Sequence, residues 1–389
     1  MKILIITPSC HYKSVGAVQK DIYSTIDLLK EIGYEVLLYT IDQPGQDLSL
    51  IGEWQKFSPQ NNFLLWLKAA IINWPLFDRS AYIFYQLSKD KTFVEFFNQV
   101  KPDIIFSYGN YSWPVSAAAV KIGAKFIIRS HNYEPLHFWE ELSTIKKIDP
   151  LNWFRFLAKL LSEKKSIKVA DAIAAISPNE EKKYKKWGRE KIVLLPLVSL
   201  YKNISAPHVS KNKETLNIFY MGASYNVPFH RWGAEVLIKK IAPKVEDLMP
   251  GKFRFYILGS KLPFVNLASN ITYMGFVPES EMSKFLYQMD IGAFPVFSGQ
   301  GMKQKIFESI CRAYPVIAPR VSLGGYTLED KKHFIEAHSI DDFVNGIFSL
   351  NDIKLRKELS IGASLFANAN FSKEKFINIF SQLCKGKKH

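Results

Sequence analysis

Short apolar runs of strand length alternate with helix-length amphipathic segments along nearly all 389 residues of this chain. The alternation predicts mainly parallel sheets with helices on both faces, because neighbouring parallel strands need a crossover connection. One set of predicted strands covers residues 2–7, 35–40, 103–107, 125–129, 171–176 and 192–195. A second set covers residues 216–221, 253–258, 271–274, 291–294 and 315–318. The chain is therefore expected to be an α/β protein.

Two domains are expected from the chain length and from the break between the two strand sets. Residues 199–214 are rich in Lys, Ser and Asn, include Pro207, and are predicted to be a linker. The predicted N-terminal domain is then 1–198 and the predicted C-terminal domain is 215–370. Residues 371–389 are predicted to form a final helix and a frayed tail.

Cysteine usage and apolar segment lengths favour a cytoplasmic location. The three cysteines, at positions 10, 311 and 384, form neither a disulfide framework nor a metal-binding spacing. The best candidate for a membrane-spanning segment, residues 63–72, is too short and contains Lys68. The net charge of +15 suits an anionic substrate, an anionic membrane surface or nucleic acid.

Residues 298–319, with the sequence SGQGMKQKIFESICRAYPVIAP, hold the most specific chemical pattern of the chain. A glycine-containing loop leads into a predicted helix, and the free amides and dipole of a helix N-terminus attract anions. Two lysines add positive charge for phosphate oxygens, and a carboxylate on the same helix face can accept hydrogen bonds from a ribose diol. This combination predicts a nucleotide diphosphate site, although a solvated basic helix with Glu308 paired to a lysine explains the same residues. The candidate residues are Gly299, Gln300, Gly301, Met302, Lys303, Lys305 and Glu308.

This motif resembles the donor-site motif of the retaining GT-B glycosyltransferases, of the family 4-like type that builds bacterial cell-surface polysaccharides. Gly301, Lys303, Lys305 and Glu308 fall on the family's positions, and Gln300 stands where many members carry a second Glu. The resemblance implies a GT-B fold, with two Rossmann-like domains facing across a cleft. It also implies that the C-terminal helix crosses back to the N-terminal domain.

The resemblance assigns roles to residues in both predicted domains. His131, in the sequence HNYE after a predicted strand, is expected to be catalytic together with Lys303 and Lys305. Ser177 is expected to cap a helix, with Glu180 completing a capping box. On the acceptor side the candidates are Gly16 and Ala17, and further donor-binding candidates are Gly222, Phe276 and Val277.

The implied function is transfer of a sugar from a UDP- or GDP-linked donor to a saccharide or lipid-linked acceptor, in cell-envelope polysaccharide or glycolipid synthesis. The two lysines and the loop amides would stabilise the leaving diphosphate, so neither a metal ion nor another cofactor is expected. A nucleotide-sugar epimerase of the same fold and an inactive donor-binding scaffold subunit are alternatives. A basic nucleic-acid-binding protein is a further alternative, but no nucleic-acid motif is present.

Residues 54–97 match the family least, and their role stays open between two structures. Aromatic and basic residues are mixed from Trp54 to Tyr85, with further tryptophans at positions 66 and 74. Such a mixture suits the interface of a bilayer, and it also suits a packed helical lid. Residues 155–191 are strongly basic. We therefore expect peripheral contact with the inner face of an anionic cytoplasmic membrane.

Overall fold

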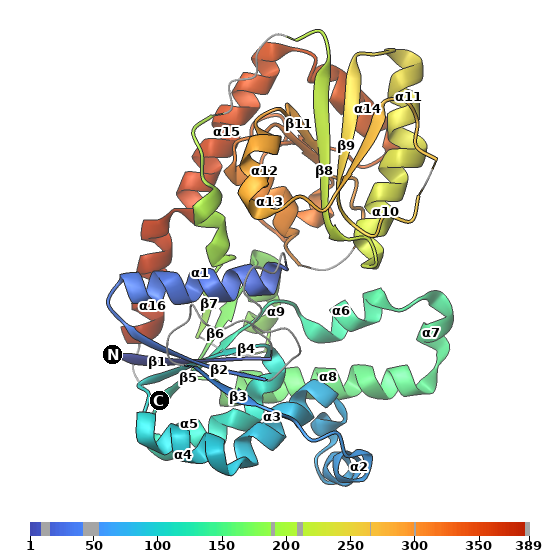
Figure 1. The fold of residues 1–389 in the computed structure, drawn as a ribbon. Helices are drawn as coiled ribbons and strands as arrows, with labels where there is room; N and C mark the ends of the chain where they lie inside the picture. The colour runs from blue at the N-terminus through green and yellow to red at the C-terminus, as the bar shows by residue number, and fades with distance from the viewer. Residues whose placement is uncertain are drawn as a thin grey trace. The chain divides into compact units, whose positions relative to one another are not determined.

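The computed structural model describes residues 1–8, 16–41, 54–187, 191–207, 213–264, 266–298 and 301–385. The chain forms two compact units (Figure 1). Unit 1 consists of Met1–Ser199 with Phe376–His389, and unit 2 consists of Leu200–Lys375. Between the two strand sets, the 3-10 turn η3 (Val198–Asn203) begins the segment predicted to be a linker, and its Leu200 is fully buried.

Unit 1 contains a parallel sheet whose described strands number seven, in the order β3-β2-β1-β4-β5-β6-β7. The strand order reverses between β1 and β4, and ligands of open α/β sheets bind beside the carboxyl ends of the strands at such a point. The strands are β1 (Lys2–Thr7), β2 (Glu35–Ile41), β3 (Trp54–Phe57), β4 (Ile104–Tyr108), β5 (Lys125–Arg129), β6 (Ala172–Ala175) and β7 (Ile192–Leu194).

Helices cover both faces of this sheet, with α1 and α16 on one side and α4 and α5 on the other (Figure 1). Side chains on both faces of the sheet are buried, for example those of Ile105 and Phe106 in β4, so both faces contribute to the apolar core. The helical segments of this unit are α1 (Ala17–Glu31), α2 (Phe63–Ile72), η1 (Trp74–Phe77), α3 (Arg79–Lys89), α4 (Lys91–Val100), η2 (Asn110–Val115), α5 (Ser116–Ile122), α6 (Glu134–Glu141), α7 (Thr144–Ile148), α8 (Pro150–Val169), α9 (Pro178–Lys185) and α16 (Lys373–Lys385).

The last helix returns the chain to unit 1, as the sequence predicts. Phe380 of α16 is buried, and its ring centre lies 6.0 Å from that of Phe106. The Lys125 ammonium donates a hydrogen bond to the Leu383 carbonyl. These contacts fix α16 on the sheet although Lys125 and Leu383 are 258 residues apart in the chain.

Unit 2 contains a second parallel sheet, whose described strands number six, in the order β10-β9-β8-β11-β12-β13. Its order reverses between β8 and β11. The strands are β8 (Leu216–Ser224), β9 (Phe253–Ser260), β10 (Ile271–Gly275), β11 (Ile291–Ala293), β12 (Val316–Ala318) and β13 (Ile335–Glu336). The helical segments are α10 (Pro228–Val236), η4 (Leu237–Ile241), α11 (Ala242–Leu248), α12 (Glu279–Leu286), α13 (Gln304–Cys311), η5 (Arg320–Ser322), α14 (Ile340–Ser349) and α15 (Ile353–Phe371).

The strands predicted from the sequence are all present, with ends shifted by three residues or fewer. Two strands were not predicted. The edge strand β3 is partly exposed and mixes polar with aromatic residues, and β13 is only two residues long. Neither one gives the continuous apolar run that marks a strand buried on both faces. Throughout the described ranges, every helix is too short or too polar to cross a lipid bilayer.

Candidate functional site

The loop before α13 is held against the following segment of unit 2. Gly301 has a φ of 78°, a left-handed conformation that favours glycine. Met302 is buried and pairs with Leu323 in an antiparallel bridge. Lys303 is the N-cap residue of α13 and its amide donates to the Ser322 carbonyl at 3.3 Å. The loop thus delivers the start of α13 to the carboxyl end of β11. The predicted loop residues Gly299 and Gln300 lie outside the described residues.

Glu308 lies in the second turn of α13 with its carboxylate buried. One oxygen accepts a hydrogen bond from the Gln304 amide at 2.8 Å, and the other accepts one from the Lys305 ammonium at 2.8 Å. The Lys305 and Glu308 side chains are only 13% and 7% exposed, so solvent screens this ion pair weakly. The lysine–carboxylate pairing that the sequence left as an alternative is therefore present in this structure. It also fixes the direction of the carboxylate.

The start of α10 contributes two residues to this site that the sequence analysis missed. The Lys303 ammonium lies 4.3 Å from the centre of the Phe229 ring, a cation–π contact. The rings of Phe229 and His230 are 4.4 Å apart. Burial, together with the charges of Lys303 and Lys305, lowers the pKa of His230 from 6.5 to about 4. Burial is the larger cause of this shift, and the part that comes from the two lysines places both ammonium charges near His230.

The other predicted donor residues of unit 2 lie at the carboxyl ends of its strands. Gly222 lies within β8, just beyond the strand end predicted at residue 221, and a Cβ there would come within 2.8 Å of the Tyr225 ring. A Cβ on Gly259 of β9 would come within 2.5 Å of the Gly222 carbonyl oxygen. The two glycines thus allow β8 and β9 to end close together. Phe276, which is 52% exposed, and Val277 directly follow β10.

In unit 1, Ser130 separates His131 from the end of β5. His131 lies beside a buried ion pair. Arg129 and Asp21 are fully buried, with Nε and Oδ2 3.0 Å apart. The His131 ring stacks on Tyr108 at 5.3 Å, and its Nε2 lies 3.6 Å from Asp21 Oδ2, beyond hydrogen-bonding distance. Burial lowers the pKa of His131 to about 4, with Asp21 opposing this effect and Arg129 adding to it. His131 is therefore neutral at pH 7.

The predicted acceptor-side residues lie at the start of the helix that carries Asp21. Gly16 is the N-cap residue of α1, and its φ of −69° is accessible to any residue. Ala17 is the first residue of α1. Asp21 lies about one turn further along, and its Oδ1 accepts a hydrogen bond from the Val198 amide at 2.6 Å. The helix therefore places Gly16 and Ala17 about one turn from Asp21, which lies beside His131.

A buried polar network lies behind His131. Ser177 caps α9 as predicted, accepting a hydrogen bond from the Glu180 amide. The Glu180 carboxylate accepts a hydrogen bond from the Ser130 hydroxyl at 2.9 Å, a contact that the expected capping box does not include. Burial raises the pKa of Glu180 from 4.5 to about 7. The Ser130 hydroxyl also contacts the Tyr184 hydroxyl at 2.8 Å.

Comparison with known proteins gives a family match in unit 2 and fold matches over the whole chain. Residues 215–352 match the model of the glycosyl transferases group 1 family. A search of curated protein sequences finds no match to this chain. Since only part of the chain matches the family model, the solved structures are the comparison that covers both units.

Three solved structures illustrate the fold match. Sucrose-phosphate synthase from Thermosynechococcus elongatus is 15% identical, with 98% of each chain covered and a TM-score of 0.69. HepE from Anabaena, in complex with UDP, is 13% identical over 98% of this chain and 99% of that one, with a TM-score of 0.67. The lipopolysaccharide outer core galactosyltransferase WaaB is 15% identical with the same coverage and a TM-score of 0.61. The predicted GT-B fold is confirmed.

The low pKa of His131 makes a testable contribution to stability. A histidine whose folded pKa lies below its unfolded value of 6.5 stabilises the fold above pH 6.5 and loses this contribution as the pH falls to about 4. Between these values the unfolding free energy of the wild type should fall by about 3 kcal/mol more than that of His131→Gln, because Gln does not titrate. Chemical denaturation at a series of pH values measures this. Parallel curves for the two proteins would contradict the assignment.

Proposed function

We propose that this chain, with its GT-B fold and its glycosyl transferases group 1 match, transfers a sugar from a nucleotide diphosphate donor to a saccharide or lipid-linked acceptor. The family match and the fold both support a nucleotide-sugar-dependent glycosyltransferase. The observation that carries the donor assignment is the meeting of Lys303, Lys305, Glu308 and His230 at the strand-order reversal of unit 2. HepE, one of the proteins of similar fold, was crystallised with UDP and with UDP-glucose.

The proposed roles of the lysines follow from where negative charge develops during the reaction. As the sugar leaves, negative charge grows on the β-phosphate, and preorganised positive charge stabilises that transition state more than the ground state. Lys303 is held by the Phe229 ring, and Lys305 is held by Glu308, so neither ammonium needs much reorganisation. In this proposal the Glu308 carboxylate also accepts hydrogen bonds from the ribose hydroxyls. The lysines and the helix N-terminus do the work of a divalent cation.

His131 is proposed to contact the donor sugar as a neutral hydrogen-bonding group. With a pKa of about 4 it is a weak base at pH 7, and it is not an imidazolium that could act as a general acid. A neutral imidazole still offers one donor and one acceptor nitrogen. We infer that the reaction retains configuration by same-face attack, with the departing phosphate accepting the proton of the acceptor hydroxyl.

The acceptor is proposed to be presented at a membrane surface. Helices α2, α7 and α8 of unit 1 expose apolar side chains, and Trp74 beside α2 lies 5.6 Å from Phe154 of α8 between ring centres. We name this exposed group the apolar face. It consists of Leu64, Leu65, Ile71, Ile72, Trp74, Ile145, Ile148, Leu151, Trp153, Phe154 and Leu157, each 42% or more exposed. A patch of this kind marks an interaction site, and interfacial aromatics with neighbouring lysines suit lipid headgroups.

The tryptophans of residues 54–97 differ in their exposure. Trp66 is packed, being 9% exposed, and its indole nitrogen donates to the Leu76 carbonyl at 3.0 Å. Trp54 and Trp74 are 38% and 42% exposed.

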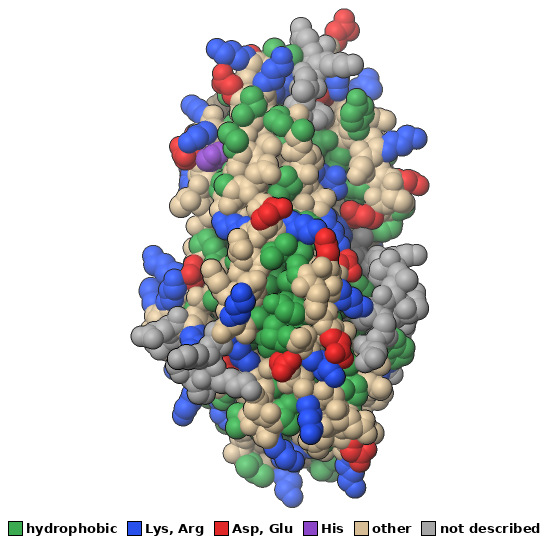
Figure 2. Space-filling model, turned by 90° about the vertical axis from the view of Figure 1, so that its left-hand side faces the viewer, with side chains coloured by type: hydrophobic (Ala, Val, Ile, Leu, Met, Phe, Trp, Pro, Cys, Tyr) green, Lys and Arg blue, Asp and Glu red, His purple; other side chains and the backbone are tan. Residues whose placement is uncertain are grey.

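The surface charge does not favour the alternative of a nucleic-acid-binding protein. On the face drawn in Figure 2, lysine and arginine side chains are spread among acidic ones, without the continuous basic stripe that a nucleic-acid-binding protein presents.

Lys303 and Lys305 are expected to increase the rate of sugar transfer. Lys303→Ala and Lys305→Ala should each lower kcat by about 100-fold, as for removal of one transition-state donor, with a smaller change in the acceptor KM. Turnover is measured by release of the nucleoside diphosphate, in the presence and absence of EDTA. Lys284→Ala, which removes an exposed charge on α12, is the control. Wild-type turnover in both variants, or a loss in EDTA that Mg²⁺ restores, would contradict the proposed role.

The apolar face is expected to bind anionic vesicles. Ile71→Ser with Ile72→Ser should weaken co-sedimentation with such vesicles without lowering the melting temperature, because both side chains are already exposed. High salt should reduce the binding of the wild type only in part, since the apolar contribution is not screened. Val120→Ser on α5, 78% exposed, is the matched control. In contrast, Trp66→Ala should destabilise the fold by about 3–5 kcal/mol.

No sedimentation of the wild type with anionic vesicles at low salt would end the membrane proposal. Equal sedimentation of the double variant and the wild type would show that another surface makes the contact.

A further inference from the structure

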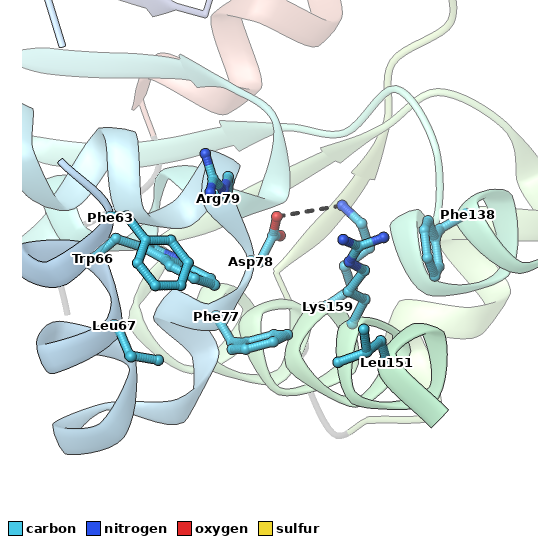
Figure 3. Close-up of a pocket in the computed structure, with 10 residues that line it drawn as sticks. Phe63, Trp66, Leu67, Phe77, Asp78, Arg79, Phe138, Leu151 and Lys159 are labelled. Atoms are coloured by element: carbon cyan, nitrogen blue, oxygen red, sulfur yellow. Dashed lines mark hydrogen bonds and ion pairs between the residues drawn. The ribbon is translucent and has the colours of Figure 1, made fainter. Parts of the chain in front are cut away.

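Unit 1 contains a cavity of about 570 Å³ whose lining includes none of the candidate donor-binding or catalytic residues. It lies between α2, η1 and α3 on one side and α6 and α8 on the other (Figure 3). Its volume falls in the range of small-molecule sites. The residues that line it are Phe63, Trp66, Leu67, Phe77, Asp78, Arg79, Phe138, Leu151, Arg155 and Lys159. Six of these ten side chains are apolar or aromatic, so the cavity suits an apolar ligand segment.

The cavity holds one acidic group, and that group already has partners. Asp78 is 7% exposed, caps α3 by accepting a hydrogen bond from the Ser80 amide, and lies 3.4 Å from the Lys159 ammonium. Lys159 also lies 3.8 Å from a Glu134 oxygen. In Figure 3 the dashed line between Asp78 and Lys159 shows this internal pair. The charge of Lys159 is thus balanced within the protein.

The two arginines of the cavity are not balanced in this way. Arg79 stacks over the Trp66 ring at 4.8 Å, and Arg155 donates to the Asn152 side-chain oxygen at 3.2 Å. Within the described ranges of the chain, neither guanidinium has a carboxylate partner. Both side chains are exposed, so they mark the solvent side of the cavity. Arginine binds phosphate through two parallel hydrogen bonds, which makes an anionic group the matching ligand there.

We propose that this cavity binds a single membrane lipid whose headgroup is a phosphate, with part of an apolar chain among the aromatic walls and the phosphate at Arg79 and Arg155. A free phosphate would leave the aromatic walls unused, and a neutral apolar molecule would leave the two guanidinium groups unused. The cavity shares Leu151 with the apolar face, so a lipid could reach it from the bilayer. The inference rests on the proposed membrane contact and adds a specific, saturable lipid site to it.

A soluble lipid tests the site without vesicles. We expect dihexanoyl phosphatidic acid, titrated below its micelle concentration in a calorimeter, to bind with a stoichiometry of one. Dihexanoyl phosphatidylcholine should bind at least about ten-fold more weakly, because its choline offsets the phosphate charge. Inorganic phosphate at the same concentration should neither bind measurably nor displace the lipid.

Substitutions in the cavity test where the lipid binds. Arg155→Ala should weaken the binding of phosphatidic acid about ten-fold, as expected for loss of charge-assisted hydrogen bonds. Leu67→Trp should block it by filling the cavity, and Leu151→Trp provides the same test from α8. The control is Lys68→Ala, which removes an exposed charge from α2 outside the cavity. Thermal melts check that each variant is folded.

Four results would overturn the inference. These are no binding of phosphatidic acid, equal binding of the two lipids, displacement of the lipid by inorganic phosphate at matched concentration, and unchanged binding in folded Leu67→Trp and Leu151→Trp. The titration contains no sugar donor and measures no turnover. Absence of lipid binding in an active transferase therefore rejects only this inference, whereas lipid binding without transferase activity rejects only the proposed reaction.

Discussion

The buried ion pair between Arg129 and Asp21 organises the candidate catalytic part of unit 1. Arg129, at the end of β5, also donates hydrogen bonds to the Leu195 and Pro196 carbonyls. Asp21, on α1, accepts the Val198 amide. A single pair thus joins the sheet, the first helix and the segment after β7. Removing one partner of such a pair leaves a buried charge and costs about 3–5 kcal/mol, so this part of the unit has little freedom to rearrange.

Burial determines the chemical state of His131 beside this ion pair. It lowers the pKa of the imidazole more than the Asp21 charge raises it, and the Arg129 charge lowers it further. The result is a neutral imidazole held against Tyr108. In unit 2 the charged residues around the candidate donor site are arranged differently. There, Lys305 pairs with the Glu308 carboxylate and Lys303 lies over the Phe229 ring, and the charges of both lysines add to the effect of burial in lowering the pKa of His230. One unit therefore offers a neutral hydrogen-bonding group, and the other offers two neighbouring ammonium groups.

Local pattern was enough to predict the described strands other than β3 and β13, the final helix, and the loop and helix start at residues 301–308. Strands buried on both faces give continuous apolar runs, and residues 301–308 form one loop and helix start in which spacing alone sets neighbours. The sequence could not identify Asp21, Arg129 or His230, because their roles come from contacts between segments far apart in the chain. A charged residue at the end of the apolar strand KFIIR was the only available signal for the buried pair.

The sequence also could not decide the fate of the aromatic residues at 54–97. A packed tryptophan differs from an exposed one in the contacts of its ring, and the amino-acid composition of the segment does not show those contacts. Trp66 is packed because its indole nitrogen reaches the Leu76 carbonyl, whereas Trp74 lies at the surface against Phe77 and Phe154. Helix α2 is apolar on nearly every side, so its pattern gave no polar face from which exposure could be predicted.

The most direct test of the account is to compare the affinities of nucleoside diphosphate and monophosphate for unit 2 of the whole protein. By calorimetry, UDP or its best-binding counterpart should bind at least about ten-fold more tightly than the monophosphate, because only the diphosphate reaches both lysines. Lys305→Ala should remove most of this ratio. Glu308→Ala should weaken both nucleotides equally, because they share the ribose. Equal affinities of the wild type for the two nucleotides, or unchanged affinities in Glu308→Ala, would contradict the proposed donor site.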